Sequence, residues 1–298
     1  MKPVLFSVSY GGFWGQDKLT LDQFIPHAAA LGYQGIEVMC KRPHLSPLDW
    51  RPERVASLKA LCDQNRLSVE CLAGYTNFMG GLETPEVPFI EMQILYTGAL
   101  VKLAKALGCK LVRVFTAYER DDMKLYDQWN RTVAAIRECC ALAAADGITI
   151  GIQNHHDLAV HSKVLLEFLN DIGQPNCKLM FDAWSPCLRG EELHETAKAM
   201  APHTVYTTFA DYIRLPRWRY QQADLTNYLP QPVDMARAVP MGDGEMDNLA
   251  FLSGLKAGGY DGPVAYEMCS QLRGGGRQEN LDYCARRFIQ WLKDNRFM

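Results

Sequence analysis

The stretch AAIRECCALAAADGITIGIQNHH, residues 134–156, decides the fold. It begins as an amphipathic helix, breaks at Gly147, continues as a short β-branched strand and ends in polar residues that start with Gln153. The same order of helix, glycine and strand recurs at Gly32 and Gly108. Glycine permits the left-handed turn that ends a helix and leads into the next strand. Alternating helices and strands of this kind predict βα units built around a parallel sheet.

Eight strands are predicted along the chain, and no shift of composition marks a linker between them. Eight parallel strands close into a barrel, whereas five or six would leave an open sheet. The 298 residues suit one barrel of this kind, which commonly runs to roughly 250 residues. We therefore expect an α/β fold, a (β/α)8 TIM barrel that forms a single domain over residues 1–298. The predicted strands cover residues 3–9, 35–40, 68–74, 110–117, 148–154, 177–183, 204–210 and 262–268.

The composition of the chain argues against a nucleic-acid-binding protein, a zinc ribbon and a membrane-spanning protein. The chain is 48% hydrophobic and 22% charged, with a net charge of −3, so it can build a large core but lacks the basic surface typical of nucleic-acid binding. Its ten cysteines form no CxxC pair, which predicts reduced core thiols rather than a zinc ribbon. No window approaches the roughly 18 apolar residues of a membrane-spanning helix. These features predict a cytoplasmic protein without nucleic-acid or membrane partners.

Two segments, 76–93 and 211–247, are longer than a plain barrel requires. Long loops in compact domains are usually functional or disordered. The second segment mixes arginines, among them Arg214, with tyrosine and tryptophan. Such a mixture can stack on sugar rings or nucleobases, pair with carboxylates or pack against another subunit, and the acidic chain disfavours nucleobases. A homo-oligomer is left open.

Polar residues stand at the ends of three predicted strands: Gln153, Asp182 and Glu267. The C-terminal ends of parallel strands converge on one mouth of a barrel, where metal and substrate chemistry is done. Residues two apart in a strand share a face, so His155 is expected to face inward with Gln153, while Asn154 and His156 point elsewhere. Carboxylates, an amide oxygen and nearby imidazoles suit a divalent ion such as Mg²⁺ or Mn²⁺.

Each of these residues also has a purely structural interpretation. A strand-end aspartate often caps the following helix, and a strand-end glutamate often pairs with an arginine. A single histidine such as His155 or His156 can simply bond a backbone carbonyl. Glu37 and Arg113, in the second and fourth strands, can form a buried structural pair or contact substrate. The recurrence of polar residues at equivalent strand ends favours the functional interpretation.

The chain resembles the xylose isomerase-like barrel family of sugar and sugar-phosphate isomerases and epimerases. The resemblance runs from about residue 5 to residue 290 and rests on the order of the segments GIEVMCKRPHLSPLDW, QNHHD, PNCKLMFDAWSP, VPMGDGEMD and GGYDGPVAYEMCS. Members of that family typically hold one divalent ion with Glu from strand five, Asp from strand six, His from strand seven and Glu from strand eight. Asp182 and Glu267 match this pattern, whereas Gln153 stands at the strand-five Glu position and Thr208 at the strand-seven His position.

The resemblance implies a divalent-metal-dependent isomerase or epimerase that acts on a keto-sugar, sugar phosphate or polyol through an enediol(ate). The expected metal ligands are Gln153, Asp182 and Glu267, and the ion is expected to be Mn²⁺ or Mg²⁺, with Co²⁺ or Zn²⁺ as further options. Epimerases of the family use two glutamates on opposite faces of the substrate, and Gln153 cannot transfer a proton. This leaves Glu267 as base and His155 or His156 as the second group.

Two alternatives remain, a keto-sugar lyase on the same barrel and a non-catalytic sugar-binding barrel that has lost its metal. The family also includes nucleases with three zinc ions, which the seven histidines of this chain disfavour. A small carbohydrate is the expected partner. The predicted substrate-binding residues are Glu37, His44, Arg113, His156, Arg214 and Arg273. Glycines between Arg273 and Arg277 resemble a phosphate-binding turn or, alternatively, a flexible turn.

Overall fold

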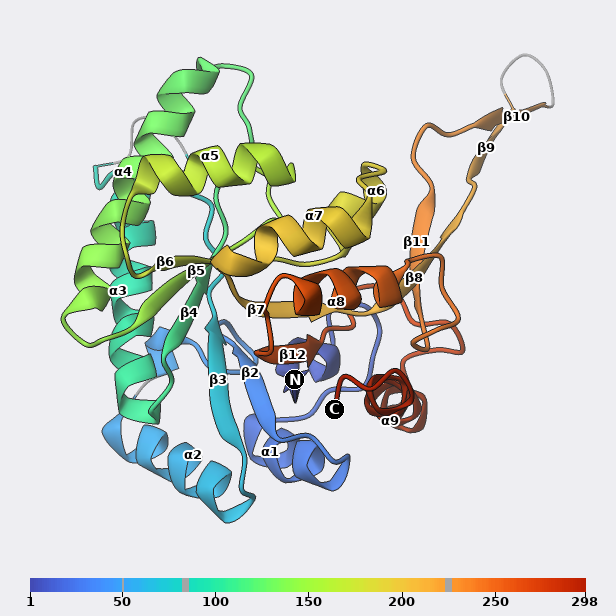
Figure 1. Ribbon diagram of the computed structural model, residues 1–298, viewed down its shortest axis with the longest axis horizontal. Coiled ribbons are helices and arrows are strands. Elements are labelled where there is room, and N and C mark those ends of the chain that lie inside the picture. Colours follow the sequence, from blue (N-terminus) through green and yellow to red (C-terminus); the bar gives the residue numbers. More distant parts are fainter. Residues whose placement is uncertain (50, 82–85, 223–226) are drawn as a thin grey trace.

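The eight predicted strands form a closed parallel barrel in the computed structural model, which describes residues 1–49, 51–81, 86–222 and 227–298 (Figure 1). Neighbouring strands follow the order β1-β12-β7-β6-β5-β4-β3-β2. The (β/α)8 TIM barrel predicted from the sequence is confirmed. Residue 50 and parts of the two long predicted segments, 82–85 and 223–226, lie outside the described residues. The barrel strands are β1 (Lys2–Phe6), β2 (Gly35–Met39), β3 (Ser68–Ala73), β4 (Leu111–Val114), β5 (Thr149–Gln153), β6 (Cys177–Met180), β7 (Thr204–Phe209) and β12 (Pro263–Tyr266).

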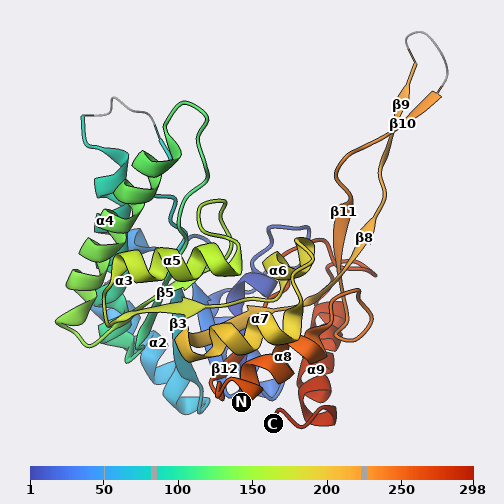
Figure 2. The ribbon, with the colours of Figure 1, turned by 45° about the horizontal axis from the view of Figure 1, so that its top comes forward.

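Helices surround the barrel on its outside (Figures 1 and 2). Three predicted helix ends are confirmed by glycines with positive φ: Gly32 at 94°, Gly108 at 74° and Gly147 at 63°. Only glycine adopts this backbone conformation without strain. The helices are α1 (Leu21–Ala30), α2 (Pro52–Gln64), α3 (Phe89–Leu107), α4 (Leu125–Ala144), α5 (Ser162–Ile172), α6 (Trp184–Leu188), α7 (Leu193–Met200), α8 (Asn248–Ala257) and α9 (Gln278–Asp294).

An apolar layer fills the barrel interior. Gly151 makes room for it, because a Cβ at this position would lie 2.7 Å from Cγ of Met180 and 2.9 Å from Cδ1 of Leu111. The layer consists of Val4, Cys71, Leu111, Met180, Tyr206 and Ala265. Inward positions recur every two residues along a strand, so the residues two positions further on form the next layer toward the C-terminal mouth. Four of these residues are polar: Arg113, Asp182, Thr208 and Glu267.

The segment after β7 differs from the loop that was predicted. It forms a two-part β-ribbon, in which β8 (Asp211–Leu215) pairs with β11 (Met235–Val239), and β9 (Trp218–Gln221) pairs with β10 (Asn227–Pro230). This ribbon projects away from the barrel (Figures 1 and 2). Every residue of β9 and β10 is exposed. The inner ends of β8 and β11 are buried against the barrel, whereas β9 and β10 are exposed throughout. Because neither face of the outer half is buried, no alternation of polar and apolar residues is required there, and the sequence did not indicate strands.

The cysteines of the chain are all free thiols, and only Cys187 and Cys269 are partly exposed. Burial raises the pKa of the Cys62 thiol to about 11, which keeps it in the unreactive thiol form at neutral pH. None of the helices in the described part of the chain combines the length and hydrophobicity that crossing a bilayer requires.

Candidate functional site

Arg113 lies at the centre of the polar layer and has no exposed surface. Its Nη1 donates to Oε1 of Gln153 at 3.0 Å, and its Nε and Nη2 donate to the carbonyl oxygen of Gly74 at 3.4 and 3.3 Å. Aromatic faces hold the guanidinium in place, because cations are attracted to the electron-rich face of a ring. The rings within 4.4–5.2 Å are those of Phe6, Tyr75 and Phe115.

Gln153 connects Arg113 to the carboxylate of Asp182. Its Nε2 donates to Oδ2 of Asp182 at 3.0 Å, while its Oε1 accepts from Arg113. A guanidinium only donates hydrogen bonds and a carboxylate only accepts them. The amide therefore has one satisfactory orientation, with its oxygen toward Arg113 and its NH₂ group toward the acid.

Asp182 lies two residues beyond β6 and is 4% exposed. The side chain of Asn154 binds both its backbone and its carboxylate, and the backbone N–H of Ser185 donates to Oδ1 at 3.3 Å. Burial raises the pKa of Asp182 to about 7, and the donors around it oppose this shift. Asp182 is thus partly protonated near neutral pH. Asn154 was expected to point away from the site, so its positioning role was missed.

Glu267 follows β12 and is partly exposed. The hydroxyl of Thr208 donates to its Oε2 at 3.1 Å. Burial raises the pKa of Glu267, while the charge of Arg113 and hydrogen bonds from Thr208 and Gln153 lower it. A carboxylate with a raised pKa that still reaches solvent can accept a proton from a ligand.

Glu37 forms a second carboxylate contact with Arg113, from the β2 side of the barrel. Its Oε1 lies 3.6 Å from Nη1 of Arg113, and both side chains are fully buried. Neither carboxylate oxygen of Glu37 has a hydrogen-bond partner among the described residues, and the hydroxyl of Tyr206 has none either. Burial raises the pKa of Glu37 to about 8. Glu37 is therefore mostly protonated at neutral pH, and its lack of exposed surface places it beneath the mouth rather than at it.

The two histidines after β5 differ from the expected arrangement. His155 is exposed and His156 is buried, and the strand alternation behind the predicted directions ends here, because the backbone turns at once after Gln153 and the N–H of His155 donates to the Gln153 carbonyl at 2.9 Å. The Nδ1 atoms of the two rings lie 3.1 Å apart. Both rings pack on Phe115, with centroid distances of 4.7 and 4.4 Å.

Both imidazoles are neutral at neutral pH. The ring of His155 is open to solvent on one side but packs on Phe115, and desolvation by its neighbours, followed by the charge of Arg113, lowers its pKa to about 4. Burial, followed by the neighbouring His155, lowers the pKa of His156 to about 3. A neutral imidazole donates one hydrogen bond and accepts another, but it is a poor general acid at this pH.

The other predicted substrate contacts lie apart from this layer or are already satisfied by the protein. His44 is buried, and its ring nitrogens contact Oγ of Ser7 at 2.9 Å and the carbonyl of Leu19 at 3.0 Å. Both ring nitrogens of His44 thus have partners within the protein, and its contact with substrate stays a prediction. Arg214 lies at the base of the ribbon, where its Nε is 3.1 Å from Oε2 of Glu245.

Arg273 is exposed in the loop after β12 and binds the ribbon through its backbone, since its N–H donates to the Ala238 carbonyl at 2.9 Å. The glycines that follow shape this loop. Gly274 and Gly275 have φ of 86° and 93°, values that only glycine adopts readily. Nδ2 of Asn280 donates to the carbonyls of Arg273 and Gly275 at 2.9 and 2.7 Å. A structured turn thus accounts for the glycines.

The predicted metal ligands do not fit a divalent ion as they are arranged. The oxygen of Gln153 lies against the positive charge of Arg113, which would repel a cation bound to the same oxygen, and its NH₂ group faces Asp182. Thr208 offers only a neutral hydroxyl, whose hydrogen is directed at Glu267. Within the described ranges, His, Cys, Asp and Glu side chains form no group of three that could hold a metal ion. Asp182 and Glu267 alone remain as carboxylate ligands.

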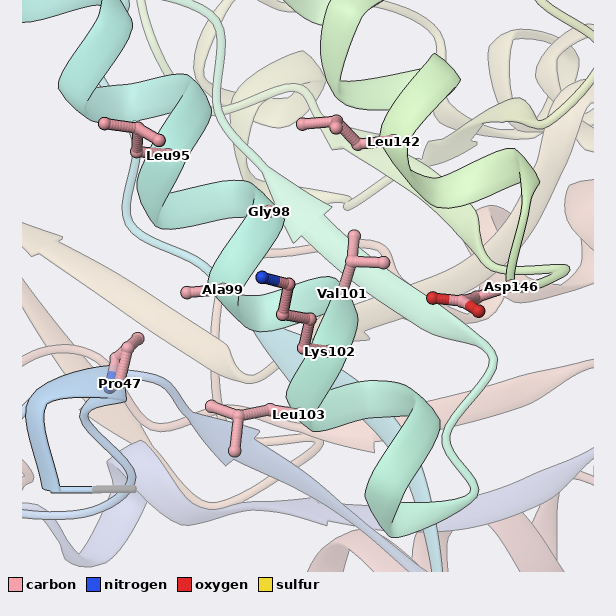
Figure 3. A pocket seen from close by; sticks show the side chains of 9 residues that line it. All are labelled: Pro47, Leu95, Gly98, Ala99, Val101, Lys102, Leu103, Leu142 and Asp146. Carbon is pink, nitrogen blue, oxygen red and sulfur yellow. The ribbon is translucent and has the colours of Figure 1, made fainter. Parts of the chain in front are cut away.

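A pocket of about 340 Å³ lies outside the barrel, between α3 and the end of α4 (Figure 3). Leu95, Gly98 and Leu142 contribute to its mostly apolar lining. Asp146 lies at its edge but pairs with Lys105. The pocket brings together none of the acid and base groups of the strand-end layer, so the candidate site is that layer.

The closed barrel with acids at its strand ends is a TIM barrel with a polar site at its mouth. Comparison with known proteins identifies the family. The chain belongs to the xylose isomerase-like TIM barrel family, whose model matches residues 25–294. A 2-epi-5-epi-valiolone 7-phosphate 2-epimerase from Actinoplanes sp. is 28% identical over 163 residues, which make up 55% of this chain and 57% of that protein. The match thus spans little more than half of that curated relative.

Two solved structures show how widely the fold is shared. D-allulose 3-epimerase from Methylomonas sp., in complex with D-allulose, has a TM-score of 0.72 at 18% identity and covers 99% of this chain and 97% of its own. The probable 3-DHS dehydratase from Bacillus anthracis has a TM-score of 0.70 at 16% identity and covers 98% of this chain and 99% of its own. Both structures thus share the barrel fold of this chain.

Proposed function

We propose that the protein is a sugar isomerase or epimerase that acts on a keto-sugar or polyol through an enediol(ate), with Glu267 as the proton-transfer group. The observation that carries this proposal is the pair of carboxyl groups, Asp182 and Glu267, which share the donor Gln153 and both have raised pKa values. Enediolate chemistry needs a base near neutral pH, and burial is the ordinary way to tune one. The epimerase relative supports the substrate class.

In this proposal ionised Glu267 removes a proton from the carbon next to the substrate carbonyl. The electron pair of the broken C–H bond forms the enediolate, whose oxygen accepts a hydrogen bond from the exposed, neutral ring of His155. The hydroxyl proton of the adjacent oxygen passes to the former carbonyl oxygen within the cis-enediolate, and Glu267 returns its proton to the former carbonyl carbon, which completes an aldose–ketose exchange. Asp182 holds a proton for part of the time, so the carboxyl pair carries less than two negative charges. Because the ligands do not fit a divalent ion, none of these steps passes through a metal.

Gln153 favours isomerisation over two-base epimerisation. Epimerisation by two bases needs a proton carrier on each face of the carbon, and an amide carries none at ordinary pH. A single base also suits β-elimination next to a carbonyl, so a keto-sugar lyase is the second candidate. One observation favours both candidates over two-base epimerisation, namely that Gln153 is bound to Arg113 and Asp182 and no carboxylate stands at that position.

Solvent isotope exchange tests the reaction class. Keto-sugars and polyols that raise the melting temperature are incubated with the protein in ²H₂O and followed by NMR. Deuterium should enter at the carbon next to the carbonyl, and Glu267→Gln should slow this exchange by about 10²–10⁴-fold, whereas Glu53→Gln on the exposed side of α2 should not. Sugars that bind without exchange would contradict the proposal and favour a binding barrel. An ultraviolet-absorbing enone product would identify a lyase.

Several finer features belong to the same proposal. A small carbohydrate is the partner, and the loop with Arg273 is the place where a phosphate group on it would be held. If so, Arg273→Ala weakens binding of a phosphorylated sugar and leaves its unphosphorylated form unaffected. Equal weakening of both would rule out a phosphate contact. A cytoplasmic setting and a homo-oligomer stay predictions from the sequence.

A further inference from the structure

We propose that this site balances its carboxylates with an internal cation, Arg113, and with amide and hydroxyl donors, in place of a bound divalent metal ion. The inference concerns the same site as the proposed function but not its reaction. A measurement of metal binding therefore tests it even if no sugar proves to be a substrate.

The first step of the argument is the fixed orientation of Gln153. Its amide bonds Arg113 through oxygen and Asp182 through nitrogen, both at 3.0 Å. Turning the amide to offer its oxygen to an ion would place its NH₂ group against a guanidinium and its oxygen against a carboxylate. Both contacts would then be repulsive, because neither partner can exchange its role as donor or acceptor. Gln153 is 2% exposed, so water cannot replace the lost hydrogen bonds.

The second step is that Arg113 cannot withdraw. Its guanidinium is fully buried, stacks on three aromatic rings and donates to the carbonyl of Gly74. That carbonyl is itself fixed, because the backbone N–H of Gly74 donates to the carbonyl of Arg113 at 3.1 Å between β3 and β4. The orientation of Gln153 is thus set by groups that belong to the barrel wall.

The third step concerns Thr208, the other position at which the sequence departs from the ligand pattern. Its hydroxyl donates to Oε2 of Glu267 at 3.1 Å. Each of the two carboxylates, Asp182 and Glu267, therefore accepts a hydrogen bond from an uncharged side chain at a position where the family pattern has a charged or imidazole ligand. A neutral amide and a neutral hydroxyl are weaker ligands for a divalent ion than a carboxylate and an imidazole.

The buried positive charge of Arg113 also disfavours a divalent ion at this site. The positive charge of Arg113 lies 3.6 Å from Glu37 and within electrostatic reach of Glu267. A divalent ion between Asp182 and Glu267 would be repelled by this buried cation, because like charges interact strongly in a poorly solvated interior. The barrel already contains its own fixed positive charge.

The test compares metal binding by the natural chain and by variants that place a carboxylate or an imidazole at the positions of Gln153 and Thr208. Protein purified without chelator is analysed for metals by mass spectrometry, and its melting temperature is measured with and without MnCl₂. Gln153→Glu and the double variant Gln153→Glu/Thr208→His are measured in parallel, with circular dichroism to verify that each is folded. Gln64→Glu, on the exposed side of α2, provides the same charge change away from the site.

We expect the natural chain and Gln64→Glu to contain no stoichiometric metal and to show no melting shift with Mn²⁺. Gln153→Glu, the nearly isosteric change, should gain a Mn²⁺-dependent rise of several degrees, and the double variant a larger one. One equivalent of metal in the natural chain, lost in Asp182→Asn, would overturn the proposal. Folded variants that ignore Mn²⁺ would also overturn it, because Gln153 and Thr208 would then not be what excludes the ion.

Discussion

At the scale of single residues, one buried cation, Arg113, acts on two acids, Glu37 and Glu267. The same guanidinium donates to Gln153, which in turn donates to Asp182. Buried charges are tolerated when they are paired and hydrogen-bonded, and they become costly when a partner is removed. The residues of this layer are therefore expected to respond to mutation far more strongly than exposed residues of the same type.

Replacing Arg113 with Met should destabilise the fold by about 3–5 kcal/mol, because it removes the buried donor to the Gly74 carbonyl and the Gln153 oxygen and the charge that favours ionised Glu267. Urea unfolding monitored by circular dichroism measures this loss. Arg219→Met, in the exposed strand β9, is the matched control and should change the free energy of unfolding by less than about 0.5 kcal/mol. Equal effects of the two changes would show that Arg113 does not carry the charge balance.

Glu37 predicts a pH dependence whose sign follows from its raised pKa. The folded chain keeps the proton up to about pH 8, whereas the unfolded chain releases it near the usual value of 4.5. The folded state therefore binds more protons between these values, and stability falls as the pH rises through this window. Glu37→Gln removes this dependence.

Relative to the natural chain, the Glu37→Gln variant should gain stability on the order of a few kcal/mol between pH 5 and pH 8.5. Urea unfolding of both proteins at the two pH values measures the difference. A gap that stays constant across this range would mean that Glu37 is ionised in the folded protein.

At the scale of elements, close helix packing limits what the chain tolerates. Helix α8 packs against α7, and Gly254 lies where the two meet, since an added Cβ would overlap the backbone carbonyl of His194. Gly98 occupies a similar interior position in α3, but its added Cβ would come no closer than 3.4 Å to Leu142 beside the outer pocket. The two glycines thus differ in what a methyl group would meet.

Gly254→Ala should destabilise the protein by about 1–3 kcal/mol through overpacking. Gly98→Ala should instead stabilise it by roughly 0.5–1 kcal/mol, because alanine loses less backbone freedom than glycine when a helix forms. Thermal unfolding by calorimetry distinguishes the two. A loss of stability in both variants would show that the α3–α4 groove is packed more tightly than its dimensions indicate.

Strand positions and the inward polar layer could be predicted because both follow from a two-residue repeat. Asp182 and Glu267 continue this repeat from Met180 and Ala265. The repeat ends directly after β5, where the chain turns, so it cannot fix the directions of His155 and His156. The orientation of the Gln153 amide could not be predicted either, because it is set by Arg113 from another strand.

At the scale of the whole molecule, the ribbon of β8, β9, β10 and β11 projects away from the barrel (Figures 1 and 2). Its outer half exposes large apolar side chains, with Trp218 60% and Tyr228 61% exposed. Exposed apolar groups of this kind mark surfaces for interaction more often than structural positions. The ribbon is therefore expected to matter for association rather than for folding.

In dilute solution, Trp218→Ser and Tyr228→Ser should each change the free energy of unfolding by less than about 0.5 kcal/mol relative to the natural chain. Calorimetry measures this, and light scattering after size exclusion reports the mass of each variant in the same samples. A large loss of stability together with a lower mass would show that the ribbon folds against a second copy of the chain.

The pairing of the ribbon strands also determines how fast their backbone amides exchange with solvent. Among the described residues, β9 and β10 pair with each other and with no other strand, so their amides can open without disturbing the hydrogen bonds of the barrel, and two-stranded ribbons are barely stable by themselves. Amide hydrogens there should exchange with deuterated water orders of magnitude sooner than those of β5 or β12, which open only when the barrel does. Amide exchange is thus expected to be fast in the ribbon and slow in the strands that carry the acids.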